Sequence, residues 1–316
     1  MVASSLAVML AVIRTARTAD ASSVPSSAGP VDCLRVRVVG NRMTSPRADV
    51  LSAAHRSLAA AGEHDRAGWL DLFTADGRVE DPVGSSPHRG RAAIGNFYDT
   101  FIGPREISYD LDADLVVGAT VLRDLTLAIQ MSSTLTMQVP AYIRYDLKDT
   151  AGGLRIAALS AYWELPAMVR RFLGGGVGAV PAGLALGQAM VIHQGLRGST
   201  GFLRGFAGTG TGTGKAFGRL LGDACDGDEI GVRRRTAGAV ITAGDDEPRT
   251  ASDVVRLLSG GRWDKQIRSG RSVAARVHTS DQRAIVIGEY RTRGADRAAL
   301  SRLQVFSDTD TDTDRA

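Results

Sequence analysis

The chain has 316 residues, a length that suits two domains better than one. Hydrophobic residues make up 44% of the composition and charged residues 23%, which argues against wholesale disorder. The formal net charge is only +4, and basic and aromatic residues do not interleave as they do in nucleic-acid-binding proteins. We therefore expect a globular protein that has no nucleic-acid partner.

The cysteines and histidines predict neither a disulfide framework nor a metal site. Cys33 and Cys225 lie far apart with no second pair, which excludes a four-cysteine zinc site and fits a reducing compartment. The five histidines do not show the spacing of metal ligands on one helix face. We expect a cytoplasmic location.

The N-terminal segment is apolar but short. "SLAVMLAVI" (Ser5–Ile13) has the length of a signal-peptide core, yet no basic region precedes it. It is too short to cross a bilayer as a helix, so we expect no stable membrane span. The following "TARTADASSVPSSAGP" has a linker composition. Residues 1–42 are predicted to be a disordered leader or a stretch upstream of the true start, with a weak export signal as the alternative.

Helical patterns begin after residue 43. "SPRADVLSAAHRSLAAAG" has a Ser-Pro helix start and a glycine stop at Gly62. "HDRAGWLDLFTADG" predicts a second helix that buries Trp69 and Phe73 and ends at Gly77. After an extended segment and a turn-rich loop, "RAAIGNFYDTFIG" predicts a third helix.

The pattern then changes to strands. "TVLRDLTLAIQMS" and "TLTMQVPAYIRYDL" alternate apolar and polar residues, as half-buried antiparallel strands do. "GGLRIAALSAYWEL" predicts another strand, entered through a Gly-Gly turn. Helices followed by such strands predict an α+β fold, in which helices pack on one face of a curved antiparallel sheet.

A region rich in glycine and alanine follows, and we predict a linker over residues 167–214. Within it, Val180–Leu196 is expected to pack between domains, or else to touch a membrane surface as a small-residue helix. "GTGTGTGKA" (Gly208–Ala216) resembles a phosphate-binding loop, but Thr209 stands where that loop needs glycine and Ala216 where it needs serine or threonine. A flexible linker is the better prediction.

The first pattern recurs beyond the linker. "GAVITAGDDEP" takes the place of "GRVEDPVGSSP", and "TASDVVRLLSGG" that of the third helix. The predicted domains are therefore 43–166 and a degenerate second copy at 215–307. The acidic tail 308–316 is expected to be disordered.

Two adjacent carboxylates draw attention in the stretch "GRVEDPVGSSPHRG", where Glu80 and Asp81 directly precede Pro82. The simplest interpretation is an Asx turn at the end of a strand. The other is an acid held among apolar segments to move a proton. Alternation along the strand puts Glu80 on the side opposite to Asp81. No Gly-x-Ser-x-Gly motif supports serine hydrolase chemistry.

The stretch "LFTADGRVEDPVGSSPHRGRAAIGNFY" resembles the signature of the bacterial ketosteroid isomerases, within the wider SnoaL-like and nuclear transport factor 2-like superfamily. The acid-proline loop, a downstream Arg-Gly and the "AAI…FY" helix carry the resemblance, which extends over residues 45–165. It implies a cone-shaped curved sheet with helices on its concave face. It also implies a hydrophobic substrate, such as a steroid or polycyclic ketone, and no cofactor.

The resemblance makes Asp81 the general base, which would take a proton from a carbon between a ketone and an alkene and return it further along. The dienolate oxygen that forms needs preorganised donors. Tyr98 matches the family's supporting tyrosine and His55 takes the place of the family's oxyanion tyrosine, so these two are the candidate donors. Ala141 stands where the family has a protonated aspartic acid. Tyr142 is predicted by alternation to point to the other face, unless a bulge intervenes. His55 as a surface residue and Tyr98 as a core tyrosine are the alternatives.

Five residues are predicted to be core residues, some of which would line the cavity: Phe73, Phe97, Ile143, Tyr145 and Trp163. The first functional hypothesis is an isomerase. The second is a non-catalytic module that binds a hydrophobic small molecule, and the third is a SnoaL-like cyclase or hydrolase. Thr242 is aligned with Asp81 in the second copy, which we expect to be catalytically silent. We expect that copy to form an intramolecular pair with the first copy, with a homodimer as the alternative.

Overall fold

The computed structural model describes residues 46–132, 135–164, 211–293 and 297–308, which fall in one compact unit, Ser45–Ala316. The described residues contain two six-stranded sheets with helices, so the α+β prediction is confirmed. The leader 1–42, the segment Val180–Leu196 and all but one residue of the tail lie outside the described residues.

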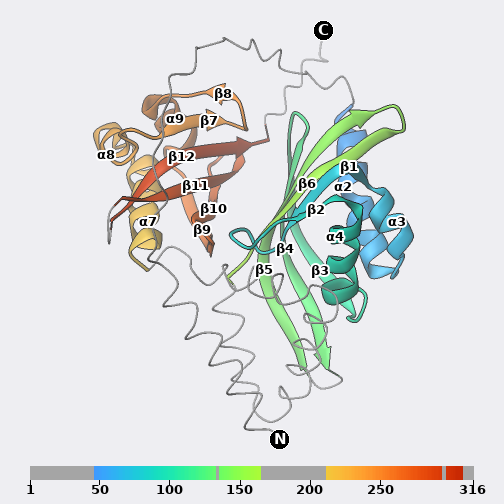
Figure 1. Ribbon diagram of the computed structural model, residues 1–316. Helices are drawn as coiled ribbons and strands as arrows, with labels where there is room; N and C mark the ends of the chain where they lie inside the picture. The colour runs from blue at the N-terminus through green and yellow to red at the C-terminus, as the bar shows by residue number, and fades with distance from the viewer. Residues whose placement is uncertain (1–45, 133–134, 165–210, 294–296, 309–316) are drawn as a thin grey trace, which may run out of the picture. The chain divides into compact units, whose positions relative to one another are not determined.

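The first sheet is mostly antiparallel, with the strand order β2-β1-β6-β5-β4-β3 and one parallel pair, β1 with β6. Figure 1 shows α2, α3 and α4 on the same side of this sheet. The elements in chain order are α2 (Arg47–Gly62), α3 (Arg66–Asp71), β1 (Phe73–Glu80), β2 (His88–Arg89), α4 (Gly90–Phe97), the π-helical turn η1 (Tyr98–Ile102), β3 (Ile107–Val117), β4 (Thr120–Ser132), β5 (Leu135–Thr150) and β6 (Gly153–Tyr162).

Helix α2 packs closely because its buried residues are small. They recur at the spacing of one helix face, so the helix turns one stripe toward the sheet. This stripe consists of Val50, Ala53, Ala54, Ser57 and Ala61.

The second helix is shorter than the sequence predicts. It ends at Asp71, and Phe73 starts strand β1 instead of completing the helix. Phe73 pairs with Ile156 on β6, and a bulge separates this pair from the next. Gly77 lies in that bulge, where a Cβ atom would come within 2.9 Å of the Thr74 carbonyl oxygen. Pairing with β6 therefore outweighs the helical periodicity of a short segment.

The second copy has the same topology, with the strand order β8-β7-β12-β11-β10-β9 and a parallel pair, β7 with β12. Its helices also lie on one side of their sheet (Figure 1). Its elements are α7 (Thr211–Cys225), α8 (Glu229–Arg235), β7 (Val240–Ala243), β8 (Glu247–Pro248), α9 (Ala251–Leu258), β9 (Arg262–Ser269), β10 (Ser272–His278), β11 (Arg283–Arg293) and β12 (Arg297–Ser307).

Helix α7 includes part of the segment predicted to be a flexible linker. From Thr211 onward the "TGTGKA" residues are helical. The glycines allow side chains of β9 to approach the helix: a Cβ at Gly214 would lie 2.8 Å from Gln266 Nε2, and one at Gly218 would lie 3.0 Å from the Trp263 ring. Small residues here serve packing rather than flexibility.

The sheet faces that carry no helices share one apolar core. It contains residues of both copies, with Leu122 and Tyr142 among those of the first copy and Ile267 and Phe306 among those of the second. The Tyr142 hydroxyl donates to the Lys265 carbonyl at 2.9 Å. Tyr142 therefore points to the face predicted by alternation, away from the helices.

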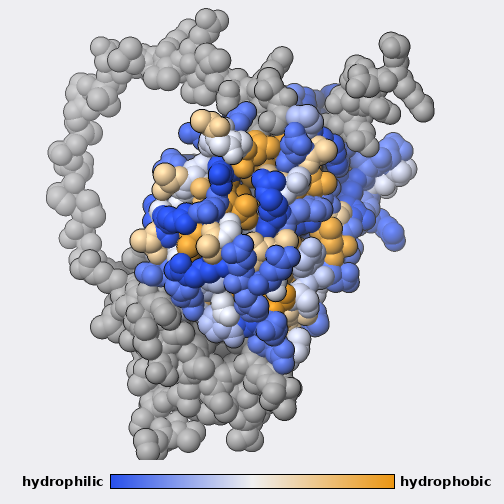
Figure 2. Space-filling view, turned by 90° about the vertical axis from the view of Figure 1, so that its right-hand side faces the viewer, coloured by the Kyte–Doolittle hydropathy of each residue, from blue (hydrophilic) through white to orange (hydrophobic). Residues whose placement is uncertain are grey.

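The surface around α2, α3 and α4 is mostly hydrophilic, with small separate hydrophobic patches (Figure 2). Among the described helices, none combines the length and the hydropathy needed to cross a bilayer.

Candidate functional site

Asp81 lies directly after β1, in a loop that begins with the cis peptide bond Asp81–Pro82. The Trp163 indole Nε1 donates to Asp81 Oδ1 at 2.5 Å. The residue keeps part of its surface open to solvent, but its carboxyl group is packed among protein atoms. This burial raises the pKa of Asp81 to about 6, against the opposing effect of the Trp163 hydrogen bond. Glu80 instead accepts from the Gly84 amide at 2.7 Å.

Aromatic rings form a buried group on the helix side of the first copy. Around Trp69, the ring centroids of Phe73, Tyr98 and Phe97 lie at 4.8, 5.4 and 6.2 Å. The Phe97 ring also contacts His88, at 5.1 Å between centroids, and burial lowers the pKa of that histidine. This part of the domain interior is apolar, as a site for a hydrophobic molecule requires.

Tyr98 is buried, and its hydroxyl has no hydrogen-bond partner among the described residues. Burial raises the pKa of Tyr98, and the charges of Asp65 and Asp99 raise it further. No hydrogen bond joins the hydroxyl to Asp81 in the described part of the chain. Tyr98 is thus an interior donor without an acceptor among the described residues, and its role as a donor to the substrate oxygen stays a prediction.

His55 lies outside the domain interior, which corrects its sequence-based placement. Its side chain is 50% exposed, and Nε2 lies 3.1 Å from Asp114 Oδ2. The buried stripe of α2 passes through Ala54 and Ser57, so the neighbouring position 55 faces outward. The polar residue on the buried stripe of α2 is Ser57, which is 2% exposed.

The residues predicted to line the cavity are buried. Ala141 is fully buried on the helix-side face of β5 and pairs with Leu125, so no donor stands at its position. The exposed fractions of the predicted lining residues are 8% for Phe73, 3% for Phe97, 6% for Ile143, 0% for Tyr145 and 9% for Trp163.

A buried polar cluster adjoins these residues, and sequence reasoning missed it. Arg123 on β4 is fully buried and donates to Asp114 through Nε at 2.7 Å and through Nη2 at 3.0 Å. Burial raises the pKa of Tyr145 to about 12, while nearby Ser57 and Arg123 lower it. A signal was present in "TVLRDLTL": the period of two puts Arg123 on the same face as Val121 and Leu125.

The second copy offers no carboxylate at the place of Asp81. Thr242 pairs with Gln304 on β12, and its hydroxyl donates to the Gly244 carbonyl at 2.9 Å. Ile241, one residue earlier, packs on the helix-side core of that copy. Thr242 therefore points to the face without helices, and by alternation Ala243 returns to the helix side.

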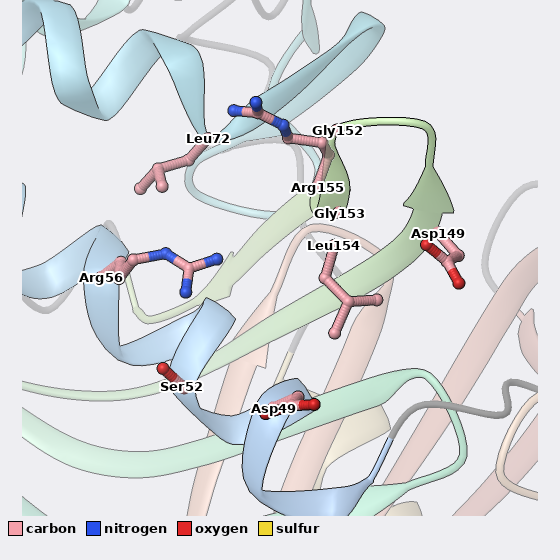
Figure 3. A pocket seen from close by; sticks show the side chains of 9 residues that line it. All are labelled: Asp49, Ser52, Arg56, Leu72, Asp149, Gly152, Gly153, Leu154 and Arg155. Carbon is pink, nitrogen blue, oxygen red and sulfur yellow. The ribbon is translucent and has the colours of Figure 1, made fainter.

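A separate pocket of about 490 Å³ lies between α2 and the turn that joins β5 to β6. Figure 3 shows the Arg56 side chain directed into it from α2, whereas Arg155 turns toward the end of α3. There Arg155 donates to the Asp71 carbonyl. None of the predicted site residues lines this pocket. Its lining residues are Asp49, Ser52, Arg56, Leu72, Asp149, Gly152, Gly153, Leu154 and Arg155.

Comparison with known proteins finds a family match within the first copy. Residues 54–159 match the family described as the SnoaL-like domain. A Δ5-3-ketosteroid isomerase from Mycobacterium sp. is 31% identical; the match covers 38% of this chain and 96% of the isomerase, with a TM-score of 0.35.

Two further solved structures come from Mycobacterium tuberculosis. A protein in complex with estradiol-17β-hemisuccinate is 27% identical over 37% of this chain and 95% of its own, with a TM-score of 0.34. An LEH-like epoxide hydrolase is 21% identical over 46% of this chain and 96% of its own, with a TM-score of 0.34.

Proposed function

We propose that the SnoaL-like domain formed by residues 54–159 is part of a cofactor-independent isomerase that moves a double bond in a steroid-like ketone, with Asp81 as the proton carrier. One observation carries the proposal: the Asp81 carboxyl is packed among protein atoms, accepts a hydrogen bond from Trp163, and has a pKa of about 6. A carboxylate with a pKa close to the working pH is suited both to accept a proton and to return it.

The reaction needs a base, Asp81, and an atom that accepts an electron pair, the ketone oxygen of the substrate. Asp81 takes a proton from the carbon between the ketone and the alkene, and the electron pair of that C–H bond moves toward the ketone oxygen. The dienolate then takes the proton back from Asp81 at the far end of the former alkene. Atoms and charge balance without a cofactor, and the apolar aromatic group favours a hydrophobic ring system.

The second candidate is a non-catalytic module that binds a hydrophobic molecule in the same interior. The observation that favours it is Ala141, because this residue provides no donor for the dienolate oxygen. Proton transfer distinguishes the two candidates.

The test follows the ultraviolet absorbance of a 3-oxo-Δ5-steroid, since conjugation of the product creates a new band. The wild type should turn the steroid over, and Asp81→Asn should lower kcat by at least about 100-fold. The matched control is Asp71→Asn, which changes an exposed carboxylate outside the site and should keep full activity. Binding without turnover in the wild type would leave the binding module as the function.

A stability measurement separates lost chemistry from lost folding. The Asp81 pKa is raised in the folded state, so its ionisation costs stability as pH rises from about 4 to about 6, and at pH 7 that cost is complete. The uncharged amide of Asp81→Asn removes the cost. We expect its free energy of unfolding at pH 7 to rise by about 1–3 kcal/mol in urea titrations.

A further inference from the structure

Two fully buried donors on the helix side of the first sheet have no acceptor in the part of the chain that the structure describes. Asp114 occupies Nε and Nη2 of Arg123, but Nη1 has no hydrogen-bond partner among the described residues. The Tyr145 hydroxyl also has none among them. Ser57 lies beside this hydroxyl and lowers its pKa, although the contact falls short of a well-directed hydrogen bond. A buried donor without an acceptor is costly, so the pair indicates a missing acceptor.

The two donors belong to one site. Arg123 pairs with Ile143 across β4 and β5, and Val121 pairs with Tyr145. Arg123 and Tyr145 are therefore diagonal neighbours on one face, a separation that long side chains bridge. Their free polar atoms can approach the same ligand atom.

This site lies in line with Asp81. Asp81 follows the β1 residue that pairs with Ser160, which puts it level with Ala161 on β6. Ala161 pairs with Ile143, and Ile143 with Arg123. Three interstrand spacings, about 14 Å, thus separate the backbones of the base and of the arginine. A substrate that contacts both side chains would place its rings over Ala161 and Ile143.

The charge balance selects the acceptor. Asp114 already pairs with Arg123, so a ligand carboxylate would leave an uncompensated negative charge in the interior. A ketone oxygen accepts from both donors without adding charge, and its hydrogen bonds strengthen as the dienolate forms. We propose that Arg123 Nη1 and Tyr145 Oη donate to the ketone oxygen of the substrate. This assignment rests on the proposed function and supplies the donors that Ala141 and His55 do not.

The experiment compares two ligands and two matched variants. Tyr145→Phe removes only the hydroxyl, and Tyr142→Phe makes the same change three residues away on the opposite face of β5. The ligands are a 3-oxo-Δ4-steroid and its 3-deoxo analogue, and equilibrium dialysis measures binding. Arg123→Lys serves as a second variant, because it keeps a cation beside Asp114 but removes Nη1.

We expect Tyr145→Phe to weaken binding of the ketone by about 5- to 10-fold and to leave the deoxo analogue unchanged. Arg123→Lys should act in the same direction, and Tyr142→Phe should spare both ligands. Equal effects on the two ligands, no effect on either, or no binding of the ketone by the wild type would each overturn the assignment.

Turnover separates this assignment from the proposed function. In an active enzyme, Tyr145→Phe should lower kcat more than it changes KM, because the bonds to oxygen strengthen in the transition state. Selective weakening of ketone binding without wild-type turnover would refute the isomerase and retain the subsite. Turnover that depends on Asp81, with no ligand selectivity in Tyr145→Phe, would refute the subsite and retain the isomerase.

Discussion

Two opposing influences set the proton affinity of Asp81. Burial raises the pKa of the carboxyl group, and the hydrogen bond from Trp163 stabilises the charged form and lowers it. The outcome, about 6, lies well above the ordinary value for aspartate but still leaves the group mostly ionised at neutral pH. Trp163 therefore positions the acid and also keeps it in the form that accepts a proton.

The pH profile should report this balance. We expect kcat/KM for the isomerisation to fall below pH 6, because a protonated Asp81 cannot act as a base. Trp163→Phe removes the donor and should move this acidic limb to higher pH. Trp263→Phe, at a residue that is 37% exposed, is the matched control and should leave the limb in place. An acidic limb that moves to lower pH in Trp163→Phe would contradict the role assigned to the indole.

Among single residues, the sequence points to the acid, Asp81, more clearly than to the residues that would act with it. The "EDPVG" stretch draws attention to Asp81, but its role as a base is what the resemblance to the isomerases implies. Whether a residue of α2 faces the interior depends on its position around the helix axis. His55 faces outward, whereas Ser57, only two residues later, is buried. The pairing of Arg123 with Asp114 depends on the register of β3 against β4, which no local pattern contains.

Among the elements, the turn between β9 and β10 contacts the loop that follows Asp81. Ser269 Oγ donates to the Val83 carbonyl at 2.9 Å. Beside it, Gly270 packs directly on Gly84, so a Cβ atom on either glycine would collide with the other. The second copy thus supports the acid-bearing loop, even though it has no carboxylate at the corresponding place.

Gly270→Ala should disturb this support. Gly270 has φ +55, and the alanine would meet both backbone strain and the collision with Gly84. Gly118→Ala is the matched control, because φ there is +58 and a Cβ atom would meet nothing within 4 Å. In urea titrations, we expect the free energy of unfolding to fall by about 1 kcal/mol for Gly118→Ala and by about 2–4 kcal/mol for Gly270→Ala. Equal losses would show that the loop moves aside without cost.

The sequence predicts elements well where one face is buried throughout. The long strands β4 and β5 show the expected alternation, and α2 ends at the predicted Gly62. Strand β3, at the sheet edge, was not predicted, although "ISYDLDADLVV" alternates apolar and polar residues; of this strand only Leu115 is buried. The predicted end of α3 was wrong, because Phe73 pairs with a strand that lies more than 80 residues later in the chain. This pairing ends the helix at Asp71.

On the scale of the whole molecule, the two copies meet around a buried charge. Asp124 of β4 is fully buried on the face without helices and contacts Lys265 Nζ at 2.5 Å and Arg276 Nη1 at 2.8 Å. Both cations belong to the second copy. Asp124 and Arg123 are adjacent on β4, so their side chains lie on opposite faces of the sheet. Asp124 contacts the second copy, and Arg123 lies in the interior on the helix side.

Asp124→Asn should weaken the whole molecule, because it removes the buried carboxylate that lies nearest to Lys265 and Arg276 and leaves them the more exposed Asp112, at 3.4 and 3.5 Å. Breaking a buried ion pair from one side costs more than the pair itself contributes, and we expect a loss of about 3 kcal/mol in the free energy of unfolding. The matched control is Asp71→Asn, whose partner Arg91 and own side chain are 59% and 61% exposed, so its loss should stay below about 0.5 kcal/mol. Tryptophan fluorescence in urea reports on both copies, since Trp69 and Trp163 belong to the first and Trp263 to the second. If Asp124→Asn costs no more than the control, this charge cluster does not hold the copies together.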